Sequence, residues 1–124
     1  MNRSRFLVVA SILGLVFGLA FLLAPAQLMS FYGMTLDSAG QWIGRFLGAQ
    51  LVGLAVITWL ARNAPTGGAL SAVIIGNLVG STIALALAIL QGISGIGNAL
   101  VWSTAVVYAF LAAGFAYFQF GKSQ

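Results

Sequence analysis

The chain has 124 residues, of which 61% are hydrophobic and only 5% are charged. Five Lys or Arg residues and one acidic residue cannot provide the polar surface of a water-soluble domain, so a soluble globular fold is excluded. The apolar residues form long unbroken blocks instead of the alternating pattern of a barrel strand. The sequence therefore predicts an all-α integral membrane protein.

The missing residue types limit the chemistry of the chain. Cysteine and histidine are absent, which excludes disulfides, thiolate chemistry, side-chain zinc sites and histidine-ligated haem. No two titratable side chains converge on one site, so we expect no catalytic residue, no metal and no cofactor. The basic residues stand singly at the ends of apolar blocks, and the net charge of +4 therefore does not indicate a nucleic-acid partner.

The first apolar block covers residues 6–24 and is followed by Pro25. At about 1.5 Å per residue it nearly matches a hydrocarbon core of about 30 Å. Arg3 and Arg5 before the block, with the Ala24-Pro25-Ala26 sequence after it, also fit a cleaved signal peptide. The block is longer than the usual apolar core of such a peptide, so we expect a retained span.

Three further apolar blocks follow. Ser38 and Gln41 have the spacing of a capping box, which predicts a helix start near Ser38. Residues 62–68 and the glycine-rich residues 92–97 are turn signals between blocks. The later spans are predicted at residues 38–61, 69–91 and 98–120, and residues 25–40 are predicted to be a loop. Short connections predict a single domain, residues 1–124, folded as a four-helix antiparallel bundle.

The charges at the block ends predict the orientation in the membrane. With a cytoplasmic N-terminus, the cytoplasmic side carries Arg3, Arg5, Arg62 and Lys122. The opposite side carries only Arg45 and Asp37. Because basic residues concentrate on the cytoplasmic side of membrane proteins, we expect both termini to be cytoplasmic, in a bacterial cytoplasmic membrane.

Glycines recur at four-residue spacing in the first three spans. The pairs with this GxxxG pattern are Gly14 and Gly18, Gly44 and Gly48, and Gly76 and Gly80. Small residues let membrane helices approach closely, so we expect these positions to be packing faces. The expected partners of the protein are membrane lipids and other transmembrane helices, in a homo-oligomer or in a larger complex.

The third span carries a stripe of small and polar residues at spacings of three and four: Asn77, Ser81, Ala84, Ala88 and Gln91. Asn77 is expected near the middle of the bilayer, where an unpaired amide is costly. We expect a hydrogen bond to another helix, with Gln50 as the natural partner. A ligand contact at Asn77 and Gln50 remains an alternative.

Arg45 is expected about two turns into the second span. Its side chain can extend to the lipid head groups, which would make its role structural. Its small neighbours Gly44, Gly48 and Ala49 also leave space for a bound lipid head group or another anion. Both interpretations stay open, whereas Asp37 is expected to be a favourable charge at a helix N-terminus.

Part of the first half of the chain resembles a known group of proteins. Pro25, the Phe31-Tyr32-Gly33 turn, and the run Arg45-Phe46-Leu47-Gly48-Ala49 with Gly53 are similar to small bacterial membrane proteins of the DoxX-like and related unknown-function families. The resemblance implies a four-helix bundle and brings no agreed activity or cofactor.

The sequence favours a non-catalytic function, that of an accessory or structural subunit of a larger membrane assembly, or of a lipid-associated scaffold. The alternative is a passive channel, or a carrier or binder of a small anionic or lipid-like molecule around Arg45 and Asn77. Small-residue faces that point outward would imply a partner. A hydrophobic pocket beside Arg45 or Asn77 would favour lipid or quinone-like binding.

Overall fold

The computed structural model describes residues 1–121, which are helical apart from short connections and contain no strand. The helices are α1 (Arg3–Leu23), α2 (Pro25–Phe31), α3 (Ser38–Leu60), α4 (Gly68–Ser94) and α5 (Val101–Phe120). All except α2 are long and apolar enough to cross a membrane. The predicted class, an all-α integral membrane protein with four spanning helices, is confirmed.

The short helix α2 was not predicted, and the expectation of a loop was wrong for Pro25–Phe31. Pro25 stands at the start of α2, where its missing N–H is no disadvantage and its fixed φ angle suits a helix. The helix ends at Phe31 with Tyr32 as its C-cap, and Gly33 follows with a φ of 73°. Residues other than glycine rarely adopt this backbone conformation, so Gly33 permits the turn that leads back toward α3.

The spanning helices end close to the predicted positions, and the differences have local causes. The N-cap of α3 is Asp37 rather than Ser38, because the Asp37 carboxylate accepts a hydrogen bond of 2.7 Å from the Gly40 N–H. Helix α4 continues to Ser94 and ends where Gly95 adopts a left-handed conformation, with φ of 74°. Helix α5 starts later than predicted because Asn98 belongs to the preceding turn.

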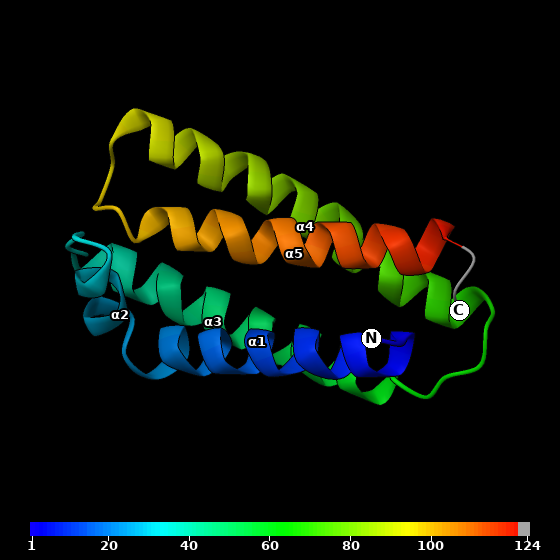
Figure 1. Ribbon diagram of the computed structural model, residues 1–124. Helices are drawn as coiled ribbons and strands as arrows, with labels where there is room; N and C mark the ends of the chain where they lie inside the picture. Colours follow the sequence, from blue (N-terminus) through cyan, green and yellow to red (C-terminus); the bar gives the residue numbers. More distant parts are fainter. Residues whose placement is uncertain (122–124) are drawn as a thin grey trace.

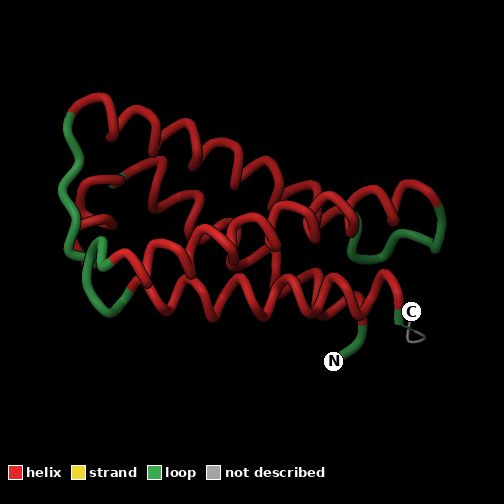
Figure 2. Tube along the Cα trace, turned by 90° about the horizontal axis from the view of Figure 1, so that it is seen from above, coloured by secondary structure: helices red, strands yellow, loops and turns green. Residues whose placement is uncertain are grey.

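The spanning helices are arranged as two antiparallel pairs, α1 with α3 and α4 with α5 (Figures 1 and 2). The pairs meet chiefly at the end of the molecule where α1 begins and α5 ends. Phe6 of α1 is buried there, with ring centroids 4.9 Å from Phe115 and 5.4 Å from Phe118 of α5. Because this aromatic cluster joins the pairs at one end, the pairs can separate toward the other end.

Close backbone contact holds α1 against α3. A Cβ atom added to Gly48 would lie 2.5 Å from the carbonyl oxygen of Gly18 and 2.5 Å from the Leu22 nitrogen. One added to Gly14 would meet Ala55 at 3.4 Å, and one added to Gly44 would meet Pro25 at 3.0 Å. Gly48 therefore lies where the backbones of α1 and α3 come close together, while Gly14 faces a side chain of α3 and Gly44 faces Pro25 of α2.

Gly76 and Gly80 of α4 are placed differently. No atom of another helix lies within 4 Å of the position that a Cβ atom would take at either residue. The expectation that these glycines form a packing face inside the bundle is wrong. Helix α4 packs against α5 with another face and is not packed along α3, so both glycines stay exposed.

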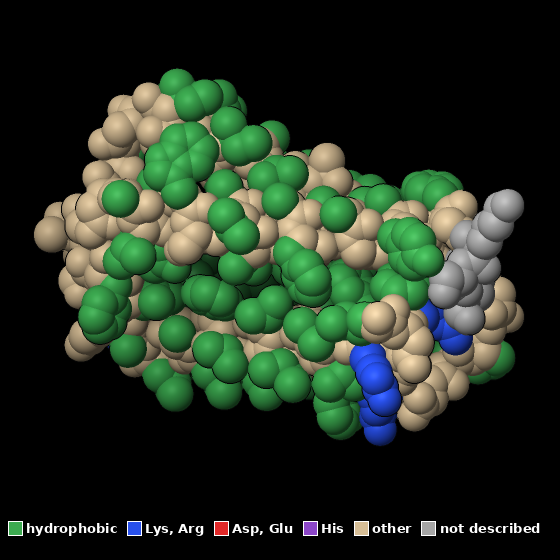
Figure 3. Space-filling view, viewed as in Figure 1, with side chains coloured by type: hydrophobic (Ala, Val, Ile, Leu, Met, Phe, Trp, Pro, Cys, Tyr) green, Lys and Arg blue, Asp and Glu red, His purple; other side chains and the backbone are tan. Residues whose placement is uncertain are grey.

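The outer surface is largely apolar, and the basic side chains on the face in view gather at the end where α1 begins (Figure 3). At this end Arg3 donates a hydrogen bond of 3.2 Å to the Ala64 carbonyl, and Ser4 donates one of 3.1 Å to the Asn63 side chain. These bonds tie the start of α1 to the α3–α4 connection. Lys122, which the charge pattern placed at the same end, lies outside the described residues.

Candidate functional site

A cavity of about 420 Å³ lies between the two helix pairs. All five helices contribute to its lining, and Figure 3 shows a hollow between α5 and the α1–α3 pair. Ligand pockets in proteins commonly measure about 300–1,000 Å³. The cavity lies between the aromatic cluster around Phe6, which joins the pairs at one end, and α2 with its following turn at the other end. It is therefore large enough for part of a lipid-sized molecule.

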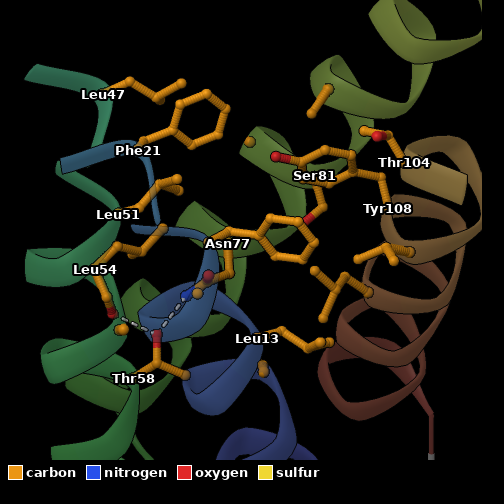
Figure 4. Close-up of a pocket in the computed structure, with 18 of the residues that line it drawn as sticks. Leu13, Phe21, Leu47, Leu51, Leu54, Thr58, Asn77, Ser81, Thr104 and Tyr108 are labelled. Carbon is orange, nitrogen blue, oxygen red and sulfur yellow. Dashed lines mark hydrogen bonds between the residues drawn. The ribbon is translucent and has the colours of Figure 1, made fainter. Parts of the chain in front are cut away.

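The cavity walls are mostly aliphatic and aromatic. Phe21 of α1 and Leu47, Leu51 and Leu54 of α3 form one side (Figure 4). No charged side chain is among the lining residues of the described chain. The polar side chains that border the cavity are uncharged, and they include Thr58, Asn77, Ser81, Thr104 and Tyr108. The site thus combines an apolar enclosure with a few neutral hydrogen-bonding groups.

Asn77 joins α4 to α3 across one side of the cavity. Its side-chain nitrogen donates a hydrogen bond of 3.1 Å to the Thr58 hydroxyl and one of 3.0 Å to the Val73 carbonyl (Figure 4 shows the Thr58 bond). The Thr58 hydroxyl in turn donates one of 2.8 Å to the Leu54 carbonyl. The amide N–H groups of Asn77 are thus used, while its amide oxygen has no hydrogen bond with any described residue.

Ser81 lies one turn after Asn77 and also lines the cavity. It is 7% exposed, and its hydroxyl makes no hydrogen bond with any described residue. Tyr108 reaches toward the same space from α5 (Figure 4). The middle of the cavity is therefore bordered by hydrogen-bonding groups that the protein does not pair with one another.

Helix α2 and the turn after it close the end of the cavity away from the aromatic cluster. Met29 and Met34 line the cavity there, and the Gln91 side chain lies 3.5 Å from the Met34 sulfur. Asn98, in the α4–α5 turn, donates a hydrogen bond of 3.0 Å from its side chain to the Phe31 carbonyl. A second bond, from the Asn98 backbone N–H to the Tyr32 carbonyl, measures 2.8 Å.

A family model described as "Domain of unknown function (DUF8292)" matches residues 2–120. The chain belongs to this family. No curated protein and no solved structure matches it. The family description names no activity, so the function of this family member has to be argued from the cavity and its lining.

Two of the residues expected at a ligand site of this family member lie outside the cavity. Arg45 is half-buried, and its guanidinium carbon lies 4.8 Å from the centre of the Trp42 ring. Gln50 lies on the exposed face of α3 and makes no hydrogen bond with Asn77. The expected pairing of Asn77 with Gln50 is therefore wrong, and Thr58 takes that place.

The position of Thr58 has a sequence signal that was missed. Leu47, Leu51, Leu54 and Thr58 follow at spacings of four, three and four, and all four side chains line the cavity. The sequence instead indicated Gln50 as the partner of Asn77. The rotation of α3 about its axis decides otherwise, because it turns Gln50 outward and Thr58 inward.

Proposed function

We propose that this membrane protein binds a lipid-like molecule from the bilayer in the cavity between its helix pairs, as a binder or carrier without catalytic activity. The observation that carries the proposal is the cavity of about 420 Å³, with apolar walls and unpaired neutral polar groups. Such a combination suits an amphiphile that reaches the site through lipid. The sequence placed this function second, after that of an accessory subunit.

The position of the cavity supports access from the bilayer. The helices on both sides of it are apolar on their outer faces, and the hollow in Figure 3 lies between two of these surfaces. A polar group kept from water without a partner costs free energy. A bound molecule that fills the cavity and bonds to Ser81 would remove that cost.

The other versions of a small-molecule function have less support. Arg45 does not line the cavity, so an anion bound at Arg45 would not occupy the same site as a molecule beside Asn77. A passive channel needs a continuous path through the protein. The cluster of Phe6, Phe115 and Phe118 fills the end where the helix pairs meet.

Matched substitutions in α4 test the proposal. Gly80 and Gly76 are one turn apart, both are exposed, and both have open space where a Cβ atom would lie, but only Gly80 lines the cavity. A Phe side chain at position 80 can enter the cavity, whereas one at position 76 meets only lipid. We expect wild type and Gly76→Phe to co-purify with the same small molecules, measured by mass spectrometry, and Gly80→Phe to lose one of them. Identical profiles for all three proteins would contradict the proposal.

A second candidate is the accessory or structural subunit, or the lipid-associated scaffold, that the sequence favoured. Gly53 of α3 and Gly76 of α4 support it, because both are exposed and have open space beside them. Another transmembrane helix could approach closely at such positions. Native mass spectrometry of protein extracted gently from its own membrane separates the candidates. Partner chains support the subunit, while an isolated chain or homo-oligomer with a small molecule supports the binder.

We also propose that both termini are cytoplasmic, in a bacterial cytoplasmic membrane. Arg3, Arg5 and Arg62 lie at one end of the molecule and support this orientation through the positive-inside rule. A reporter that is active only outside the cytoplasm, fused after α5, should stay inactive. The resemblance to DoxX-like proteins likewise stays a prediction.

A further inference from the structure

We propose that the molecule bound in the cavity carries an uncharged hydroxyl head group, which is placed between Ser81 and Asn77. This inference rests on the proposed function and specifies the chemical class of the ligand. The ligand is an apolar chain or ring system with a neutral alcohol or phenol-type hydroxyl, rather than a fatty acid, a phospholipid or a hydrocarbon. The cavity selects this ligand class through the hydrogen-bonding groups that the protein leaves unpaired inside it.

The first argument is the Ser81 hydroxyl. A serine within a helix ordinarily bonds the carbonyl four residues earlier, and Ser11 does so with Leu7 over 2.7 Å. Ser81 is 7% exposed and lines the cavity, yet it makes no hydrogen bond with any described residue. Its hydroxyl therefore offers the cavity a hydrogen-bonding group that no described residue uses.

The second argument is the Asn77 amide oxygen, one helical turn away. The nitrogen of this amide is committed to Thr58 and Val73, which fixes the orientation of the group. The oxygen is left as an acceptor without a donor among the described residues. A hydroxyl head group can accept from Ser81 and donate to Asn77 at once, whereas a ketone can only accept.

The third argument is the absence of charge around this position. The lining residues within the described chain include no Lys, Arg, Asp or Glu. Arg45 of α3 does not line the cavity, and its guanidinium lies over the Trp42 ring. A carboxylate or phosphate in the cavity would be a buried charge without a counter-charge, which is strongly unfavourable. The cavity therefore selects against ionised head groups.

The fourth argument concerns the rest of the ligand. Phe21, Leu47 and Leu51 line the cavity on the side of α2, and Leu54 and Thr58 follow on the same face of α3 (Figure 4). An apolar chain that runs along this face keeps its head group beside Asn77 and Ser81. A pure hydrocarbon could occupy the same walls but would leave both polar groups unpaired.

Three probes with the same chain length test the inference: 1-dodecanol, ionised dodecanoate and dodecane, each isotopically labelled. Each is partitioned between nanodiscs that contain the full-length protein and empty nanodiscs of the same phospholipid, at a pH where dodecanoate is ionised. The measured quantity is the excess of probe per protein. We expect saturable excess binding of 1-dodecanol, about tenfold tighter than that of the other two probes.

Ser81→Ala is the variant that isolates the head group, because Ser81 makes no bond within the described protein that the change would remove. We expect it to weaken 1-dodecanol binding severalfold toward that of dodecane, because only the bond to Asn77 is left, while dodecane binding stays unchanged. Thr82→Ala is the matched control, since Thr82 is the next residue on α4, is exposed and does not line the cavity. It should bind all three probes as wild type does.

The outcomes separate the inference from the proposed function. Equal excess binding of all three probes, or tightest binding of dodecanoate, would overturn the neutral hydroxyl head group and leave a cavity that binds lipid-like molecules. Wild-type binding of 1-dodecanol by Ser81→Ala would also overturn it. No excess of any probe over empty nanodiscs would refute the proposed function itself, and the inference with it.

Discussion

Gly48 of α3 lies so close to Gly18 of α1 that a Cβ atom on Gly48 would be 2.5 Å from the Gly18 carbonyl oxygen. The obstacle is backbone, which cannot turn aside as a flexible side chain can. We therefore expect Gly48→Ala to push α1 and α3 apart and to lower the free energy of unfolding by about 1–3 kcal/mol. Reversible unfolding in mixed micelles or bicelles measures this change.

Gly53→Ala is the control on the same helix. No atom lies within 4 Å of the position that its Cβ would take. Because alanine favours a helix over glycine, we expect this variant to be unchanged or more stable by up to about 1 kcal/mol. An equal loss of stability in both variants would mean that replacing glycine by alanine destabilises α3 itself, and that the contact between α1 and α3 is not the cause.

The Asn77–Thr58 hydrogen bond predicts a measurable coupling between α4 and α3. We expect Asn77→Leu and Thr58→Val each to lower stability, and their double-mutant cycle to give a coupling of about 0.6 kcal/mol, with an upper bound of about 1.7 kcal/mol. The same cycle with Asn77→Leu and Gln50→Leu should give no coupling, because Gln50 lies on the exposed face of α3. A coupling to Gln50 as large as that to Thr58 would contradict the structure.

The hydrogen bonds of Asn98 to the Phe31 and Tyr32 carbonyls are expected to restrain α2 at its end of the cavity. Asn98→Ala removes the hydrogen bond of its side chain to the Phe31 carbonyl, and also the bond of 3.0 Å that the side chain accepts from the Leu100 N–H. The loss of about 1 kcal/mol of local stability should speed amide hydrogen exchange in residues 28–34 about fivefold.

Asn98→Asp separates the two bonds, because aspartate keeps the acceptor for Leu100 but cannot donate to Phe31. We expect the same acceleration of exchange in this variant. Wild-type exchange in Asn98→Asp would show that the Leu100 bond alone holds the turn, and that the contact with Phe31 does not restrain α2.

The spanning helices could be predicted from the sequence because each is a long apolar block bounded by turn residues, and lipid allows such a block no other form. Helix α2 could not, since Pro25 is as suited to stopping a helix as to starting one. The short helix thus looks like a loop until its contacts are known. Orientation in the membrane stays a prediction from the charges.

The candidate site was predictable only in part. The polar stripe of α4 indicated Asn77, which does line the cavity, and a bond to another helix. The identity of that partner depends on the rotation of α3 about its axis, which turns Thr58 inward and Gln50 outward. The cavity itself depends on the angle between two helix pairs. That angle follows from contacts far apart in the sequence, such as Phe6 with Phe115, and no local pattern encodes it.

Phe6 is the residue on which the joining of the two pairs depends most. It is 2% exposed, and its ring packs against Phe110, Phe115 and Phe118 of α5. We expect Phe6→Ala to lower the free energy of unfolding by about 3–5 kcal/mol, because it removes a buried aromatic ring and leaves a void. The same change should let the pairs move relative to each other and reduce retention of the cavity ligand.

Ile12→Ala is the control on the same helix, because Ile12 is 51% exposed and makes no contribution to the cluster. It should change stability and ligand retention little. Gly114→Val tests the contact between α1 and α5 from the other helix, since a Cβ atom at position 114 would overlap the Phe6 ring. If Phe6→Ala and Gly114→Val both bind the ligand as wild type does, the cavity does not depend on this cluster. We expect both variants to retain less ligand than wild type, since these rings are the main contact between α1 and α5.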